Sequence, residues 1–264
     1  MSATVPAPAR ARASHRIRRR AALAATLCAA VALGATACGP FGDAEPKASG
    51  PFGELTGPQI VDKAIATTKT AKSLSMDLDL KTTDGPIKAF VSTDLQGRCA
   101  GTMTIDTTGT AELIRPDDKA VYLRYDEAFL KEQSKGESPE VQAAVLKQMK
   151  GRWLKTDAKD PDAKDMVELC DLKALLADFE QSTAGTVQGE ETMVGGKKAL
   201  TLTQTYKGGE KDTFYVATEG KPYLLKIVTT GGKEPGTIAL SGYDKPVTAT
   251  APAKKDVLDE KDLG

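Results

Sequence analysis

Few residues in this 264-residue chain could perform thiol or imidazole chemistry: four cysteines, Cys28, Cys38, Cys99 and Cys170, and one histidine, His15. His15 lies in an arginine-rich segment at the N-terminus, so no histidine remains if that segment is removed. Serine–histidine and cysteine–histidine catalysis, histidine-dependent zinc sites and imidazole pH switches all require this side chain. The sequence therefore predicts a protein that is not an enzyme, with no catalytic residues, no cofactor and no metal site.

The N-terminal segment has the pattern of an export signal. Residues 1–20 carry six arginines and no acidic residue. Residues 21–37 are uncharged, rich in alanine and slightly short for a membrane-spanning helix. We therefore assign residues 1–37 to a signal peptide. Both general secretion and twin-arginine export are compatible with these arginines.

Cys38 follows three small residues, Ala35, Thr36 and Ala37, at the end of the apolar run. This arrangement resembles the bacterial lipobox, although Ala35 stands where leucine is commonest. The resemblance implies that Cys38 carries a thioether-linked diacylglycerol and becomes the mature N-terminus. Each buried CH₂ contributes about 0.8 kcal/mol, so several acyl chains hold a protein on a membrane. We expect a lipid anchor at the outer face of the plasma membrane; secretory cleavage after Ala37 and an uncleaved anchor are the alternatives.

Cys99 and Cys170 remain once Cys28 leaves with the signal peptide and Cys38 is lipidated. In an oxidising extracytoplasmic space, two remaining cysteines most simply form one disulfide. Such a bond would span 71 residues and stabilise the fold by about 4 kcal/mol in the loop-entropy model. A catalytic or metal-binding thiol pair is the alternative.

The charge of the mature chain limits its partners. Six of the 36 basic residues lie in the signal peptide and none of the 36 acidic ones does, which leaves 30 against 36 and a net charge near −6. This balance argues against nucleic acid and against an electrostatic hold on anionic lipid heads. The remaining 227 residues suit one domain with a sizeable core, and we expect a monomer.

Changes of composition and period divide the rest of the chain. Residues 38–56 are rich in glycine and proline and read as the lipidated cysteine and a flexible tether. Residues 57–250 form the predicted single domain, and residues 251–264 a polar C-terminal tail. The tether contains a small repeat, Gly-Pro-Phe-Gly-Asp at 39–43 and Gly-Pro-Phe-Gly-Glu at 50–54.

Within the domain, hydrophobic periodicity predicts helices and strands in alternating groups. Helical spacing covers residues 56–74, 126–133, 138–150 and 165–180. Alternation of apolar and polar residues predicts strands at 73–81, 87–94, 101–106, 110–115, 120–125, 151–157, 185–194, 197–207, 211–218, 222–230 and 237–243. Most of the strands are divided by short glycine-containing turns, which favours antiparallel pairing.

These elements predict an α+β domain with a large curved antiparallel sheet, a half-barrel of about ten strands covered on its concave face by a few helices. Plain core packing is the default role of the inward residues, and a ligand cavity between sheet and helices is the alternative. The inward positions are Met76, Leu78, Leu80, Met103, Ile105, Leu113, Val121, Leu123, Leu200, Leu202, Phe214, Val216, Leu224, Ile238 and Leu240.

The order of these segments resembles the actinobacterial LppX/LprG lipoproteins over about residues 55–260. The resemblance is carried by an anchored Cys38, a helix, the strands SLSMDLDLK and GTMTI, the stretches AVYLRYDEAFLK and GRWLKT, the late strands at 215–216 and 223–225, and the closing GYDKPVTATAPAKKDVLD. The fold of that family is similar to that of the LolA/LolB lipoprotein carriers. The resemblance implies a curved sheet closed by helices around a hydrophobic cavity, and an acylated lipid or glycolipid as ligand.

Two functions therefore remain open at the level of sequence. The first is a lipid carrier or chaperone at the outer face of the plasma membrane. The second is a non-enzymatic interaction or sensory lipoprotein with a filled core that binds an envelope protein. They differ in how tightly the inward faces of the sheet are packed.

Overall fold

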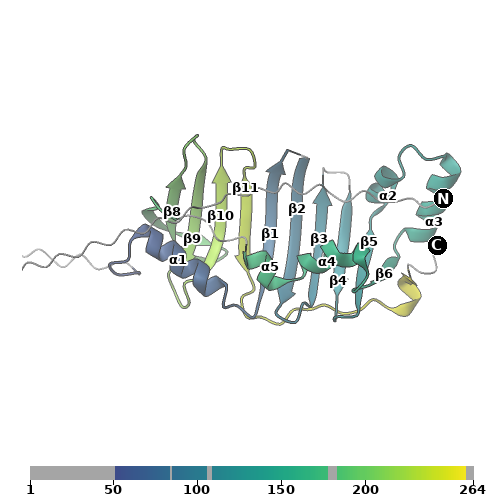
Figure 1. The fold of residues 1–264 in the computed structure, drawn as a ribbon, viewed down its shortest axis with the longest axis horizontal. Helices are drawn as coiled ribbons and strands as arrows, with labels where there is room; N and C mark the ends of the chain where they lie inside the picture. The colour runs from purple at the N-terminus through teal and green to yellow at the C-terminus, as the bar shows by residue number, and fades with distance from the viewer. Residues whose placement is uncertain (1–50, 84, 106–108, 178–182, 260–264) are drawn as a thin grey trace, which may run out of the picture. The chain divides into compact units, whose positions relative to one another are not determined.

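The computed structural model describes residues 51–83, 85–105, 109–177 and 183–259. The predicted signal peptide, Cys38 and most of the predicted tether lie outside these residues. The described chain has an α+β fold with one open, curved sheet that is not closed into a barrel (Figure 1). This is the fold class that the sequence predicts.

The sheet has twelve strands in the order β12-β6-β5-β4-β3-β2-β1-β11-β10-β9-β8-β7. The first half comprises β1 (Ser73–Thr82), β2 (Gly85–Asp94), β3 (Cys99–Ile105), β4 (Thr110–Arg115), β5 (Ala120–Tyr125) and β6 (Trp153–Asp157). The second half comprises β7 (Val187–Val194), β8 (Lys197–Thr205), β9 (Lys211–Ala217), β10 (Leu224–Thr230) and β11 (Gly236–Ser241). The two halves join where β1 pairs with β11.

The C-terminal region differs from its prediction as a polar tail. Residues Lys254–Asp256 form a short 3₁₀ helix, η2, and Val257–Asp259 form β12, which pairs parallel with β6. The sheet is therefore mixed rather than purely antiparallel. An ion pair of 2.9 Å between Lys155 and Asp259 holds the strand, together with a hydrogen bond of 3.2 Å from Arg152 Nη2 to the Val257 carbonyl. These tertiary contacts explain why a short polar segment becomes a strand.

Helix α1 (Gly57–Thr68) begins at a capping box, in which the Thr56 backbone N–H donates to Gln59 Oε1 at 2.8 Å. Its buried face includes Ile60, Val61 and Ala64, and it packs against the concave side of β9 and β10. The helix ends six residues earlier than predicted. At its end the buried Thr68 hydroxyl accepts a hydrogen bond of 3.0 Å from the backbone N–H of Leu224.

The middle of the chain supplies the remaining helices. Their bounds are α2 (Glu127–Gln133), α3 (Pro139–Met149), the 3₁₀ helix η1 (Pro161–Ala163), α4 (Lys164–Leu169) and α5 (Leu172–Ala177). Asp126 caps α2 and Ser138 caps α3, since each side chain accepts from a backbone N–H of its own first turn. The single helix predicted over 165–180 is wrong, because the chain breaks at Cys170 and Asp171 and starts again at α5.

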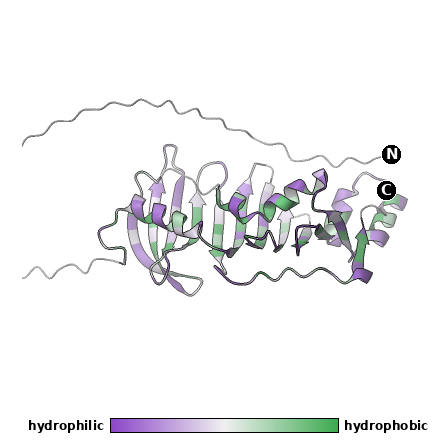
Figure 2. Cartoon of the chain, turned by 60° about the horizontal axis from the view of Figure 1, so that its bottom comes forward, coloured by the Kyte–Doolittle hydropathy of each residue, from purple (hydrophilic) through white to green (hydrophobic). Residues whose placement is uncertain are grey.

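Along each strand, side chains alternate between the two faces of the sheet. Hydrophobic and hydrophilic bands accordingly alternate along the strands (Figure 2). Helices α1, α4 and α5 lie over the lower part of the strands in the view of Figure 1. The main core lies between these helices and the apolar alternate residues of the sheet.

Candidate functional site

The concave face carries apolar side chains in rows that run across the strands. The pairing registers join one such row from β8 to β5. Its members are Leu202, Phe214, Ile227, Ile238, Leu78, Ala89, Met103, Ala111 and Tyr125. A single row therefore crosses both halves of the sheet and the β1–β11 junction.

Burial changes along this row. Leu202 and Phe214, in the part of the sheet that α1 covers, are 0% and 2% exposed. At the junction of the two halves the residues become only half-buried, although they are equally apolar. We call these half-buried residues, together with half-buried Leu80 of the adjoining row, the concave strip: Ile238, Leu78, Leu80, Ala89 and Met103. Apolar surface is thus left partly open to solvent between the helical covers of the sheet.

The next row toward the lower end of the strands is closed. Its side chains are Leu240, Met76, Val91, Leu113 and Leu123, all buried, with Gly101 between Val91 and Leu113. Leu172 and Leu176 of α5 belong to the same hydrophobic core. The short helices therefore seal this end of the concave face and leave the strip beyond it.

A disulfide fastens the α4–α5 pair to the sheet. It joins Cys99 of β3 to Cys170, with a Cα–Cα distance of 5.4 Å, and both cysteines are fully buried. The Thr93 hydroxyl of β2 donates to the Cys170 carbonyl at 2.6 Å beside it. The disulfide expected from the sequence is therefore present, and it holds the helical cover at one point.

The upper end of the concave face carries a polar cluster on β9, β10 and the turn after β8, here called the upper polar cluster: Tyr206, Asp212 and Thr229. Asp212 is 4% exposed. Its carboxylate accepts hydrogen bonds from the Thr229 hydroxyl at 2.6 Å and from the Tyr206 hydroxyl at 2.9 Å. Burial and the neighbouring Asp212 raise the pKa of Tyr206 to about 12, so its hydroxyl stays protonated at neutral pH.

A second polar group lies at the lower end of the sheet and joins neighbouring segments of the chain. The stacked rings of Tyr223 and Tyr243 lie 4.0 Å apart. Asp244 accepts from the Lys72 backbone N–H at 2.9 Å and from the Tyr223 hydroxyl at 2.7 Å, and it pairs with Lys221. The Lys72 amide and the Tyr223 hydroxyl lower the pKa of Asp244 to about 2. These contacts tie the chain after β11 to the turn between α1 and β1.

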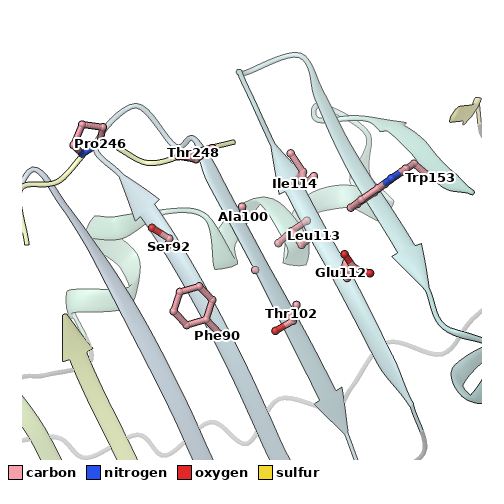
Figure 3. Close-up of a pocket in the computed structure, with 11 residues that line it drawn as sticks. Phe90, Ser92, Ala100, Thr102, Glu112, Leu113, Ile114, Trp153, Pro246 and Thr248 are labelled. Carbon is pink, nitrogen blue, oxygen red and sulfur yellow. The ribbon is translucent and has the colours of Figure 1, made fainter. Parts of the chain in front are cut away.

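The outer face of the sheet contains a hollow of about 430 Å³ (Figure 3). Phe90, 43% exposed, lines it together with Trp153. Arg124 lies 4.5 Å above the Trp153 ring and forms two hydrogen bonds, of 2.7 and 3.0 Å, with Glu112. Pro246, from the segment that follows β11, borders the hollow (Figure 3).

The structure covers the predicted inward residues to different degrees. Of the predicted cavity residues, Leu78, Leu80, Met103 and Ile238 belong to the concave strip. The side chain of Ile105 and the predicted anchor Cys38 lie outside the described part of the chain. The buried predicted residues are Met76, Leu113, Val121, Leu123, Leu200, Leu202, Phe214, Val216, Leu224 and Leu240.

Sequence reasoning missed the upper polar cluster and the outer hollow. Asp212 lies on the same face of β9 as Phe214 and Val216. A polar residue at an inward position was visible in the sequence and could have predicted a buried polar contact there. Phe90 stands out in the same way, because it is an aromatic residue on the polar face of β2. Within the described ranges, no three histidine, cysteine or acidic side chains gather as metal ligands. None of the helices in these ranges has the length and hydropathy to cross a bilayer.

Comparison with known proteins gives similarities in structure only. No protein-family model and no curated protein sequence matches the chain. LprF from Mycobacterium bovis is 14% identical with a TM-score of 0.48, and the match covers 75% of this chain and 97% of LprF. The Mycobacterium tuberculosis lipoprotein LppX is 11% identical with a TM-score of 0.46, covering 74% of this chain and 98% of LppX.

A putative outer membrane lipoprotein-sorting protein domain from Vibrio parahaemolyticus is 10% identical with a TM-score of 0.24, covering 76% of this chain and 95% of that domain. The solved structures similar to this chain thus include LppX, from the family that its sequence resembles, and a lipoprotein-sorting domain. Identities and TM-scores at this level identify neither a ligand nor a partner of this chain.

Proposed function

We propose that this chain is an extracytoplasmic lipoprotein, anchored through Cys38, that binds an acylated lipid on the concave face of its sheet as a carrier or chaperone. The observation that carries the proposal is the concave strip, an apolar surface that crosses neighbouring strands and is only half-buried. The function requires no enzymatic group, because binding and release of a hydrophobic ligand need only a surface of matching shape and polarity.

The strip has dimensions that suit an acyl chain. Its members lie on β11, β1, β2 and β3, so it extends across three strand spacings, roughly 14 Å. Each methylene group that leaves water contributes about 0.8 kcal/mol. A chain of ten methylenes on the strip would gain about 8 kcal/mol before the entropic cost of association.

The packed inward residues around the strip support a distinction between ligand contact and structural support. Leu202, Phe214 and Leu224 are fully packed and act as core. Leu78, Leu80 and Met103 keep exposed surface, so a ligand could bind them without first unpacking the fold. We therefore assign ligand contact to the strip and structural support to the remaining inward residues.

Native mass spectrometry of residues 38–264 carrying Cys38→Ser tests the proposal. The protein is purified from a lipid-producing host, and an added stoichiometric mass that organic solvent releases as an acylated lipid is the expected result. Leu78→Gln on the strip should weaken uptake of a fluorescent fatty acid several-fold. Phe90→Gln, on the outer face, is the matched control and should leave uptake unchanged. A bare protein mass with no uptake on titration would refute lipid binding.

The outer hollow favours a second function, recognition of an envelope protein. Exposed Phe90, and Trp153 beneath Arg124, combine the residue types that dominate binding energy at protein interfaces. Crosslinking in intact cells from a photoreactive residue placed at Thr102, on the same hollow, tests this function. Capture of one partner that Phe90→Gln abolishes would support it, and absence of any crosslink would count against it.

A further inference from the structure

We propose that a group of exposed lysines at the lower end of the sheet binds the anionic head groups of a phospholipid bilayer. We call this surface the lysine face: Lys72, Lys197, Lys198, Lys221 and Lys245. The inference rests on the membrane anchoring proposed above and adds the orientation of the domain, with its lower end toward the bilayer. It leaves acyl-chain binding to the concave strip.

The start of β8 and the turn between β9 and β10 place three of the lysines around one hollow of about 430 Å³. These are Lys197, Lys198 and Lys221. Asp244 lines the same hollow and accepts a hydrogen bond of 2.9 Å from the backbone N–H of Lys72. Lys245 is the residue that follows Asp244. Segments far apart in the sequence therefore gather the five lysines at one open part of the surface.

The lysine face carries a surplus of positive charge. Lys198 forms an ion pair of 2.8 Å with Glu219, and Lys221 one of 3.2 Å with Asp244. Among the described residues, none pairs with the other three lysines, and all five side chains are exposed. Five lysines against two carboxylates leave three positive charges, on a mature chain whose net charge is near −6. Because charges beyond a Debye length of about 8–10 Å are screened, a bilayer that approaches this end meets the local surplus.

The residue types favour a bilayer over a protein as the partner. Protein interfaces take most of their binding energy from tryptophan, tyrosine and arginine, and lysine is depleted in them. The aromatic residues of this region, Tyr223 and Tyr243, are buried and stack on each other, so they offer little surface to a partner. Lysine ammonium groups on long flexible side chains suit the spread negative potential of an anionic membrane.

The chain enters the domain close to the lysine face. Pro51, the first described residue, borders another hollow together with Leu200 of β8. Leu200 lies three residues along the strand from Lys197, roughly 10 Å. Twelve residues separate Pro51 from Cys38, and this connection spans at most about 45 Å when fully extended. An anchor at Cys38 would therefore hold the lysine face within reach of the bilayer.

Vesicle co-sedimentation of residues 38–264 carrying Cys38→Ser tests the lysine face without the anchor. One set of vesicles contains equal parts of dioleoylphosphatidylglycerol and dioleoylphosphatidylcholine, and the other contains dioleoylphosphatidylcholine alone. Because the two lipids carry the same oleoyl chains, contact through the concave strip would not distinguish the two sets. We expect binding to the phosphatidylglycerol vesicles only, and its loss in about 0.5 M salt, where the Debye length falls to about 4 Å.

A triple variant removes the three unpaired lysines: Lys72→Gln, Lys197→Gln and Lys245→Gln. It should bind the phosphatidylglycerol vesicles at least about tenfold more weakly, since each lysine near an anionic surface contributes about fivefold in affinity. The matched control removes three exposed lysines at the upper end of the same half of the sheet: Lys207→Gln, Lys211→Gln and Lys233→Gln. Its affinity should stay within about twofold of the unaltered chain.

Thermal melting identifies any variant that fails to fold. Equal binding to both sets of vesicles, or a triple variant that binds as tightly as the unaltered chain, would overturn the lysine face. Uptake of a fluorescent fatty acid should be unchanged in the triple variant, because its lysines lie outside the concave strip. Absence of uptake by the unaltered chain, with binding to phosphatidylglycerol vesicles retained, would refute lipid carriage and still support the lysine face.

Discussion

Removal of the Cys99–Cys170 disulfide should both destabilise the fold and free the helical cover of the concave face. The bond closes a separation of 71 residues, which in the loop-entropy model stabilises the folded state by about 4 kcal/mol. With an m-value of about 3 kcal/mol per molar urea, Cys99→Ala with Cys170→Ala should lower the unfolding midpoint by about 1.3 M. Urea titration of the two proteins measures this shift.

The same variant should show a local effect at α4 and α5. Each helix has only six residues, which is too short for a helix to persist by itself in water. Amide hydrogen exchange should therefore accelerate most in residues 164–177 and less in β8–β10. Reduction of the unaltered protein is the control that separates loss of the bond from loss of side-chain volume. A midpoint shift below about 0.3 M, or uniform acceleration throughout the sheet, would refute this account.

Three further changes test the packing and the polar contacts. Leu224→Ala should cost about 3 kcal/mol of unfolding free energy because this side chain is fully buried, whereas Leu95→Ala, at a side chain 46% exposed, should cost under about 0.5 kcal/mol in the same calorimetric measurement. Thr68→Val should cost about 1–3 kcal/mol, since it leaves a buried backbone N–H without its acceptor, and a cost near zero would contradict that contact. The Asp244 carboxyl has a lowered pKa in the folded state, so the ionised carboxylate stabilises the fold at a pH above its ordinary pKa. This stabilisation is lost as the pH falls from about 4 to about 2. The free energy of unfolding, measured against pH, should therefore change less over that interval in Asp244→Asn.

Local sequence patterns were sufficient to predict most of the elements. The alternation of Leu74, Met76 and Leu78 with polar residues fixed both the strand and its buried face, because the side-chain period of a strand is two. The break at Cys170 was not predictable from helical spacing, since Leu172 and Leu176 continue the apolar pattern across it. It depends on tertiary contacts, namely the bond to Cys99 and the hydrogen bond from the Thr93 hydroxyl.

The candidate site was predictable only in part. The alternation of side chains along a strand predicted Leu78, Met103 and Ile238 as inward residues. Burial along a row across the strands, however, depends on where helices distant in sequence come to lie. This alternation alone therefore could not distinguish the half-buried concave strip from fully packed inward residues such as Leu202. Strand β12 was missed for a related reason, since its three residues carry no periodic signal and pair with a strand about a hundred residues earlier in the chain.

The junction of β1 with β11 has a consequence for how the chain folds. Ser75 pairs with Ser241, 166 residues later, whereas most other neighbouring strands are joined by short turns. Each half can therefore form from local hairpins, and closure of the junction should limit the folding rate. If the chain is exported from its N-terminus, as we propose, the first half emerges before β11, with the edge of β1 unpaired. Such an edge is a site for aggregation. We expect this chain to depend on an extracytoplasmic chaperone until its last long strand has been delivered.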